Sequence, residues 1–372
     1  MVERIVSATL FDGQRLGPRD MIVRDGVIVN VTEPSGSGTR LEGIVTLGFL
    51  DLQVNGGGGI LWNAEPTVQG ALGIAAAHRG LGTVGIMPTL ITDAPEVMAR
   101  AADAMLDLWG EPSILGAHFE GPHINLAKRG THAARFIRPF DDASLEPIKR
   151  LRAKGIPVML TLAPEYVAPR DIALLTELGV IVSLGHSNAT SREAKAGFAA
   201  GARAVTHLYN AMSQMQGREA GLVGAAINSD AFVGIIADGH HVAPEMIALA
   251  CRARPRADRM YLVSDAMPTV GGPESFELYD MEIRVEKGRL VNPEGALAGA
   301  HISMAEGVAV LVQRAGIALC DALKMAVTHP AQLLGRPDLA TVIGRRADDL
   351  ICLTPDLGVR GTLGDLLSDV AI

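Results

Sequence analysis

The sequence predicts an α/β fold: a (β/α)8 TIM-like barrel with a small β-sandwich domain formed from both ends of the chain. Three observations predict it. Eight short apolar runs alternate with amphipathic helical stretches, most of these runs end in a polar side chain, and both ends of the chain are strand-like with a different spacing. The 372 residues suffice for one barrel and a smaller domain. We expect the β domain in residues 1–43 plus 340–372 and the barrel in residues 44–339.

The N-terminal residues contain three short segments with the apolar pattern of strands, Glu3–Leu10, Asp20–Val23 and Val27–Val31. Asp-Gly dipeptides, which favour tight turns, separate these segments. Residues Ala347–Leu353 are strand-like again. We therefore expect the C-terminal segment to pair with the N-terminal strands in one small domain.

The central part of the chain repeats an apolar run followed by a helical stretch. Continuous apolar runs separated by helices are typical of parallel strands that are buried on both faces. Eight such units are the number that a (β/α)8 barrel requires. The runs are Ile44–Val54, Thr83–Leu90, Ile114–Phe119, Pro157–Leu162, Val180–Leu184, Ala202–Thr206, Phe232–Ala237 and Met260–Val263.

Polar side chains stand at the end of almost every run. In a barrel the C-terminal strand ends form one face, so these side chains should converge on a single mouth. A doubly wound open sheet gathers strand ends only around its switch point, which fits the pattern less well. The side chains are Gln53, Asn55, Thr89, His118, Glu120, Glu165, His186, His207, Asn210, Asp238, His241 and Asp265.

Composition excludes several classes of protein. The chain has 33 Lys+Arg against 41 Asp+Glu, a net charge of −8, which argues against nucleic acid as a partner but leaves room for a small anion. The sequence has no run of 18 or more apolar residues, so we expect no membrane span. The start lacks the basic and apolar regions of a secretory signal, and the three cysteines are scattered (Cys251, Cys320 and Cys352). We expect a cytoplasmic protein.

One carboxylate and two imidazoles follow neighbouring predicted strands: Glu120 after the third, His186 after the fifth and His207 at the sixth. A single histidine in such a place is more often structural, but this N/N/O set suits a divalent metal ion that keeps an open position for water. Neutral imidazoles hold the ion, the carboxylate lowers its net charge, and the ion acidifies water. We expect one divalent metal ion per subunit, with zinc first and iron, manganese or cobalt also compatible.

Asp265 follows the eighth run through Ser264. Taken alone, it is more simply a turn residue or a helix cap. Opposite a metal-acidified water it becomes the natural general base, which can then pass its proton to a leaving group. We therefore predict that Asp265 is a catalytic residue.

Eight short motifs occur in order along the chain: Ala117–Pro122, Gly130–His132, Gly185–Ser187, Thr206–Met212, Arg218–Leu222, Ala237–Val242, Ser264–Ala266 and Leu297–Gly299. Together they resemble the family of N-acetylglucosamine-6-phosphate deacetylases, which belongs to the amidohydrolase superfamily of metal-dependent hydrolase barrels. The resemblance extends from Asp51 to about Asp349. It implies hydrolysis of the acetamide of N-acetyl-D-glucosamine 6-phosphate to D-glucosamine 6-phosphate and acetate.

The resemblance also implies roles for single residues. It gives the metal to Glu120, His186 and His207 and the acid/base role to Asp265, and it makes His132 a second catalytic group that stabilises the oxyanion. The substrate-binding residues that it implies are Thr131 and His132 at the sugar and reacting amide, Asn210 and Ala211 as donors, Arg218 and His241 at the phosphate, and Leu297, Ala298 and Gly299 along the sugar. It further implies a homodimer in which one of the two phosphate ligands reaches across the interface.

The chain departs from the superfamily pattern at the end of the first run. Members with two metal ions carry two histidines there, whereas this chain has Gln53 and Asn55, and amides are poor replacements for imidazoles. We expect Gln53 to hydrogen-bond the metal-bound water. His123 replaces a usual aromatic residue and has no assigned role. Gly56–Gly59 lacks the lysine of a phosphate loop and is expected to be a backbone turn beside the site.

Two other functions stay open on these residues. A related enzyme acting on N-acetylgalactosamine 6-phosphate or another N-acyl compound needs the same barrel, metal and base. A catalytically silent sugar-phosphate sensor needs the barrel but no acid/base, so the retained Asp265 argues against it.

Overall fold

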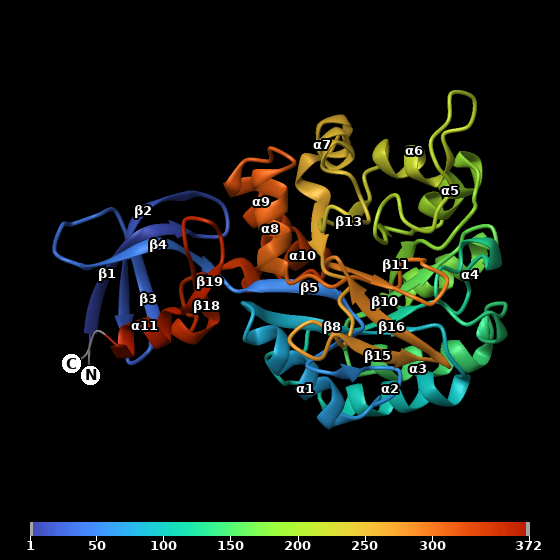
Figure 1. Cartoon of the computed structure of the whole chain (residues 1–372), viewed down its shortest axis with the longest axis horizontal. Helices are drawn as coiled ribbons and strands as arrows, with labels where there is room; N and C mark the ends of the chain where they lie inside the picture. The colour runs from blue at the N-terminus through green and yellow to red at the C-terminus, as the bar shows by residue number, and fades with distance from the viewer. Residues whose placement is uncertain (1–2, 370–372) are drawn as a thin grey trace.

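The structure, a computed structural model, describes residues 3–369 and contains both the barrel and a separate terminal sheet (Figure 1). The terminal sheet has six strands in the order β19-β18-β4-β1-β2-β3. Of its two C-terminal strands, β18 pairs with β4 and β19 pairs with β18, so both ends of the chain share one sheet. The strands are β1 (Glu3–Phe11), β2 (Leu16–Arg24), β3 (Val27–Thr32), β4 (Thr39–Leu47), β18 (Leu350–Leu353) and β19 (Val359–Thr362).

The barrel consists of eight parallel strands in chain order, and the predicted fold class is confirmed. Nearly every residue in these strands is buried, as expected for strands covered by helices on one side and by the barrel interior on the other. The strands are β5 (Phe49–Val54), β8 (Thr83–Ile91), β9 (Ala117–Glu120), β10 (Val158–Leu162), β11 (Ile181–Leu184), β12 (Ala204–Val205), β13 (Phe232–Ile236) and β14 (Met260–Val263).

Seven helices lie between these strands and surround them: α1 (Val68–Arg79), α2 (Pro95–Asp107), α3 (Asp142–Ala153), α4 (Pro169–Glu177), α5 (Ser191–Ala199), α6 (Gly221–Ile227) and α7 (Pro244–Ala253). Three further helices follow the barrel strands, α8 (Met304–Gln313), α9 (Leu319–Ala326) and α10 (Thr328–Leu333), and α11 (Leu363–Asp369) packs near the terminal sheet. Among the described residues, no helix combines the length and apolarity needed to cross a bilayer.

The apolar run Ile44–Val54 forms two strands, not the single strand that the sequence suggested. Gly48 separates β4, which pairs in the terminal sheet, from β5, which pairs with β8 in the barrel. A side chain at Gly48 would collide with Val84, because a Cβ placed there lies 2.1 Å from its Cγ1. The hydropathy pattern does not reveal a change of sheet inside one continuous apolar run. The boundary expected at residue 43 falls within β4, and the division of the chain into two domains remains our proposal.

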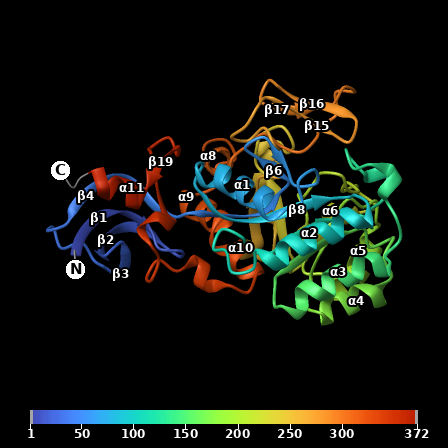
Figure 2. The ribbon, with the colours of Figure 1, turned by 90° about the horizontal axis from the view of Figure 1, so that it is seen from below.

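Two small elements lie near the barrel mouth. The glycine run forms a hairpin between β6 (Gly56–Gly57) and β7 (Ile60–Leu61). After the barrel, β15 (Ser275–Leu278), β16 (Met281–Glu286) and β17 (Arg289–Val291) form a three-stranded antiparallel sheet. Figure 2 shows this sheet standing out from one side of the barrel, away from the terminal sheet.

The seam between the first and last barrel strands is closed by the side chain of Asp51 together with backbone hydrogen bonds. Asp51 of β5 accepts hydrogen bonds from both the backbone N–H and the hydroxyl of Ser264, which follows β14. Backbone bonds continue the seam toward the mouth, where Asp265 N–H donates to the carbonyl of Gln53 at 3.0 Å. Asp51 therefore joins the two strands at the point where the last one delivers Asp265.

Substituting Asp51 with asparagine should remove a pH dependence of stability. Burial is the largest influence on Asp51 and raises its pKa to about 7, although Ser264 opposes the shift. The pKa of an aspartate in the unfolded chain is about 3.9. The stability that Asp51 contributes is therefore fully present below that pH and is lost as the pH rises through the folded-state pKa. Urea unfolding of wild type and D51N at about pH 5 and about pH 7.5 should show the difference moving in favour of D51N at the higher pH. A difference that is independent of pH would contradict an ionising carboxyl in this seam.

Candidate active site

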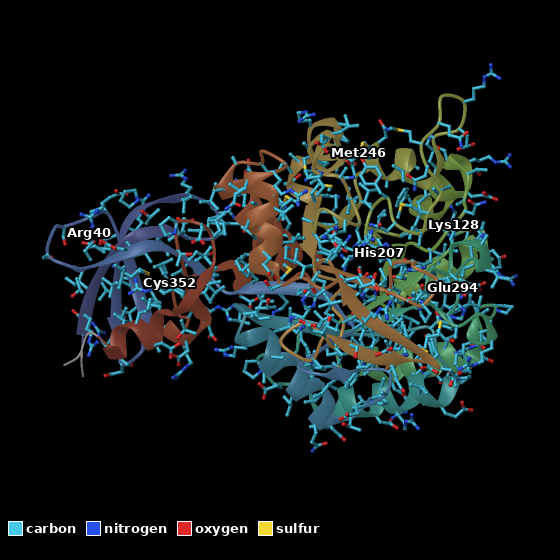
Figure 3. The ribbon with its side chains drawn as sticks, viewed as in Figure 1. Arg40, Lys128, His207, Met246, Glu294 and Cys352 are labelled. Carbon is cyan, nitrogen blue, oxygen red and sulfur yellow. The ribbon has the colours of Figure 1, made fainter. Side chains whose placement is uncertain are left out.

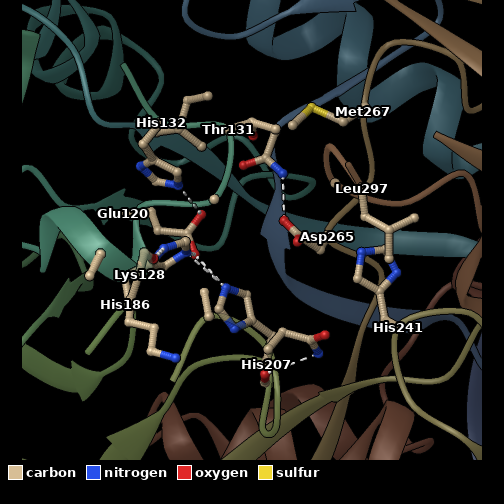
Figure 4. Close-up of a pocket in the computed structure, with 17 residues that line it drawn as sticks. Glu120, Lys128, Thr131, His132, His186, His207, His241, Asp265, Met267 and Leu297 are labelled. Carbon is tan, nitrogen blue, oxygen red and sulfur yellow. Dashed lines mark hydrogen bonds and ion pairs between the residues drawn. The ribbon is translucent and has the colours of Figure 1, made fainter. Parts of the chain in front are cut away.

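A cavity of about 260 Å³ opens at the C-terminal ends of the barrel strands. Figure 3 shows His207 within the barrel part of the molecule, and Figure 4 shows the side chains that surround the cavity. The lining residues are Asn55, Ile91, Glu120, Ala127, Lys128, Gly130, Thr131, His132, His186, His207, Asn210, Ala211, His241, Asp265, Met267, Leu297 and Gly299.

Glu120, His186 and His207 meet at the floor of this cavity. Glu120 Oε1 lies 3.2 Å from His186 Nε2 and 3.0 Å from His207 Nε2, and the two Nε2 atoms are 3.0 Å apart. All three side chains are buried. A tetrahedral ion with ligands at about 2.0–2.1 Å needs ligand atoms roughly 3.3–3.4 Å apart, which is close to this triangle.

The protonation of His186 fits a metal ligand. Its Nδ1 lies 2.8 Å from the carbonyl oxygen of Lys128, which can only accept, so the proton is on Nδ1 and Nε2 presents its lone pair to Glu120 and His207. The other ring nitrogen of His207, Nδ1, is buried without a hydrogen-bond partner in the described residues. One carboxylate oxygen and two imidazole nitrogens, buried within 3.2 Å of one another, form an arrangement that a shared cation stabilises. The donor set therefore fits a divalent metal ion.

His132 also lies near this cluster, and Glu120, His132 and His186 form an overlapping group with ligand atoms within 4.8 Å of one another. Its hydrogen bonds argue against metal ligation. The backbone N–H of Thr92 donates to His132 Nδ1 at 3.3 Å, so the ring proton is on Nε2, which faces Glu120 Oε2 at 3.8 Å. Burial, the largest influence, lowers the pKa of His132 to about 3 and keeps the ring neutral. His132 thus presents an N–H donor to the cavity, and we favour His207 as the third ligand.

Asp265 lies across the cavity from His132 and His186 (Figure 4). Asn55 Nδ2 donates to its Oδ1 at 2.6 Å, and Gln53 Nε2 donates to both Asp265 Oδ1, at 3.1 Å, and Glu120 Oε1, at 3.0 Å. Burial is the main cause that raises the pKa of Asp265 to about 6, and the charge of Glu120 adds to it. A carboxylate with a raised pKa is a stronger proton acceptor than an exposed one, as a general base requires.

The backbone at these residues is strained. His186, His207 and Asp265 have φ values of +47°, +29° and +53°, in a region that residues other than glycine rarely adopt. Such conformations persist only where the surrounding hydrogen bonds hold them, and they concentrate at functional sites.

Most of the other predicted residues also surround the cavity. Thr131, Asn210, Ala211, His241, Leu297 and Gly299 line it. Ala298 is buried between two of these residues, and Gln53 lies behind the cavity wall, where it contacts the two carboxylates. Arg218 is exposed and outside the cavity of its own chain. The cavity of one chain therefore contains no arginine.

His241 is held by Asp238 at the far end of the cavity. Its Nδ1 lies 2.6 Å from Asp238 Oδ2, and Asp238 Oδ1 accepts the backbone N–H groups of His240 and His241 at 2.8 Å. Burial opposes the shift, but the hydrogen bond and charge of His241 lower the pKa of Asp238 to about 2. The ionised carboxylate holds the ring of His241 through Nδ1 in a fixed orientation at the cavity wall.

The sequence reasoning missed Lys128. This half-buried residue lines the cavity (Figure 4). Its proximity in sequence to Gly130–His132 was the available signal. His123, whose role was open, packs edge-on against Phe140 with ring centroids 5.1 Å apart, and it does not line the cavity.

The amidohydrolase family model matches residues 44–355, and the chain belongs to this family. A protein of Shewanella sp. (strain ANA-3) named N-acetylgalactosamine-6-phosphate deacetylase is 39% identical over 85% of this chain and 80% of its own. The N-acetylglucosamine-6-phosphate deacetylase of Haemophilus influenzae is 33% identical over 86% of this chain and 84% of its own. The crystal structure of N-acetylglucosamine-6-phosphate deacetylase from Pasteurella multocida superimposes with a TM-score of 0.88, at 32% identity, over 97% of this chain and 98% of that one.

Proposed function

We propose that the chain hydrolyses the acetamide of N-acetyl-D-glucosamine 6-phosphate to D-glucosamine 6-phosphate and acetate. The observation that carries the proposal is one cavity that unites the buried set Glu120, His186 and His207 with the carboxylate of Asp265 and the N–H donor of His132. The two deacetylases of Haemophilus and Pasteurella, each matched over more than four fifths of this chain, support the choice of substrate.

Glu120, His186 and His207 would hold one divalent ion, zinc first among zinc, iron, manganese and cobalt. When bound, such an ion supplies Lewis acidity and lowers the pKa of water toward about 7. The side-chain amides of Gln53 and Asn55 point N–H groups at the carboxylates of Glu120 and Asp265, and these donors disfavour a second cation in the same place.

The chain's own groups then carry the proton transfers. His132 Nε2–H donates to the acetyl oxygen as negative charge develops on it, a contact that contributes roughly 3–4 kcal/mol in comparable sites. Asp265 accepts the proton of the attacking water and returns it to the sugar nitrogen as the C–N bond breaks. Gln53 and Asn55 hold the Asp265 carboxylate toward the cavity through its Oδ1.

The phosphate would bind at the end of the cavity formed by Asn210, Ala211 and His241, with Arg218 supplied by the second subunit of a homodimer. The exposure of Arg218 outside its own cavity supports a contribution across an interface. Fixing the phosphate would hold the acetamide at the reacting groups. We further propose a cytoplasmic enzyme, because the cysteines of the described chain are unpaired.

A second candidate substrate is N-acetyl-D-galactosamine 6-phosphate, which the Shewanella relative at 39% identity favours. Acetate release should be measured on both sugar phosphates and on unphosphorylated N-acetylglucosamine, together with the metal content of the sample. We expect the highest kcat/KM on the glucosamine compound and a large loss without phosphate. A higher kcat/KM on the galactosamine compound would reverse the order, and binding without acetate release after metal addition would indicate a sensor.

Substituting Lys128 with methionine should raise KM for the phosphorylated sugar about tenfold or more, because a hydrogen bond to a charged group contributes about 1.5–3 kcal/mol. Lys128 lines the cavity and takes part in none of the salt bridges found among the described residues. The control is Lys149→Met on α3, where the amine pairs with Glu146 at 2.7 Å far from the mouth. Steady-state kinetics would contradict the contact if KM stayed unchanged.

A further inference from the structure

Glu165 lies in the loop between β10 and α4 and accepts hydrogen bonds from two neighbouring loops. Its Oε1 accepts Asn125 Nδ2 at 2.9 Å and the backbone N–H of Asn188 at 2.6 Å, and its Oε2 accepts the hydroxyl of Ser187 at 2.7 Å. The side chain is half-buried and does not line the cavity. Both carboxylate oxygens are therefore directed toward other loops and not toward the reacting groups.

Both sets of partners lead to His186. Ser187 and Asn188 follow it directly in the chain. Asn125 donates its backbone N–H to the carbonyl of His186 at 2.8 Å, and its Oδ1 accepts the N–H of Ala127 at 2.8 Å. That second contact caps the short 3₁₀ turn Leu126–Lys128, whose last carbonyl receives His186 Nδ1–H. One path thus fixes the backbone of His186 and the other fixes its ring.

The same carboxylate reaches the next loop through Ser187. The N–H of Ser187 donates to the carbonyl of Ala211 at 3.0 Å, and its carbonyl accepts the N–H of Ser213 at 2.9 Å. Glu165 therefore bonds the loops after the third and fifth barrel strands, and the loop after the fifth is bonded in turn, through the backbone of Ser187, to the loop after the sixth. The positive φ of His186 makes external support necessary, since an unsupported residue would relax to a commoner conformation.

We propose that Glu165 is a positioning residue for the metal centre: it holds the backbone and ring of His186 in the ligating geometry before the ion binds. The inference rests on the proposed role of His186 as a metal ligand. Residues that hydrogen-bond and orient a metal ligand without touching the metal typically contribute about 10–100-fold to metal affinity. Glu165 touches neither the cluster nor the cavity, so its effect should appear in metal affinity before it appears in the chemical step.

Glu165→Gln tests this on the full-length protein, because glutamine keeps one acceptor but places an NH₂ group against donors from Asn188 or Ser187. We expect the Kd for Zn²⁺, measured on metal-free protein by competition with a chromogenic chelator and without sugar, to rise about 10–100-fold. At saturating Zn²⁺ the kcat should stay within a few-fold of wild type, because the bound ion then holds the ring. A weaker Zn²⁺ affinity with a nearly unchanged kcat at saturating Zn²⁺ does not follow from general destabilisation of the fold.

The matched control is Glu193→Gln on α5. Glu193 is also half-buried and accepts the backbone N–H and hydroxyl of Thr190, at 2.8 and 2.7 Å, but it only caps its own helix. It should leave the Zn²⁺ affinity unchanged. Asn125→Ala, which removes only the path to the ring, should weaken Zn²⁺ binding in the same direction, and it provides the test if E165Q fails to fold.

Zn²⁺ affinity equal to wild type in E165Q, or in N125A where E165Q does not fold, overturns the proposal. A loss equal to that of E193Q overturns it as well. Because Zn²⁺ is measured without sugar, failure here is distinct from failure of the proposed function. A chain that binds Zn²⁺ through His186 but hydrolyses no acetamido sugar would reject the function and leave the role of Glu165 standing.

Discussion

Replacement of Asp265 with asparagine lowers kcat about 10²–10⁴-fold, the range expected for losing a general base. Asparagine has nearly the same shape and can still contact Gln53, but it accepts no proton. KM and metal content should therefore stay near their wild-type values. Acetate release under saturating sugar phosphate, with elemental analysis of the same preparation, measures both.

Asp258→Asn is the control for this variant. Asp258 is an exposed residue that pairs with Arg256 at 2.8 Å outside the cavity, so its substitution should leave kcat unchanged. Undiminished turnover in D265N would remove Asp265 from the mechanism. Loss of metal together with turnover would instead show that Asp265 serves the metal centre.

Removing the divalent ion with a chelator abolishes acetate release, and adding about one equivalent back per chain restores it. The expected loss is essentially complete, because the ion supplies both the acidified water and the polarisation of the amide. The metal-free protein should also have a lower Tm, since a ligand that binds only the folded state stabilises it.

The variant His207→Ala tests whether the metal ion on which activity depends is the one bound by this cluster. This variant should bind less than one equivalent of metal and should not recover activity when metal is added. Full activity in metal-free wild type, or full metal content in H207A, would contradict the assignment of the cluster.

The sequence predicted the barrel well because its signal is local and repeated. Most of the barrel strands correspond to one apolar run each, and several functional side chains stand at or soon after a strand end: Glu120 is the last residue of β9, and His186 lies two residues after β11. The convergence of these side chains then follows from the geometry of a parallel barrel alone. Functional residues whose position follows from the order of the strands can therefore be predicted from one sequence.

Features that depend on packing between distant segments were not accessible. The switch of sheets at Gly48 depends on contact with Val84. The distinction between His132 as a donor and His186 as an electron-pair donor depends on Thr92 N–H in one case and the Lys128 carbonyl in the other. Neither partner is adjacent in sequence to the histidine that it orients.

The pairing of β18 with β4 has a consequence for how the protein is made. During synthesis β4 is complete some 300 residues before β18 leaves the ribosome, so one edge of β4 carries free backbone groups throughout the translation of the barrel. In truncated chains that stop before Leu350, this edge of β4 stays unpaired. Incomplete products should accordingly aggregate through the N-terminal strands, even when every residue of the catalytic centre has already been translated.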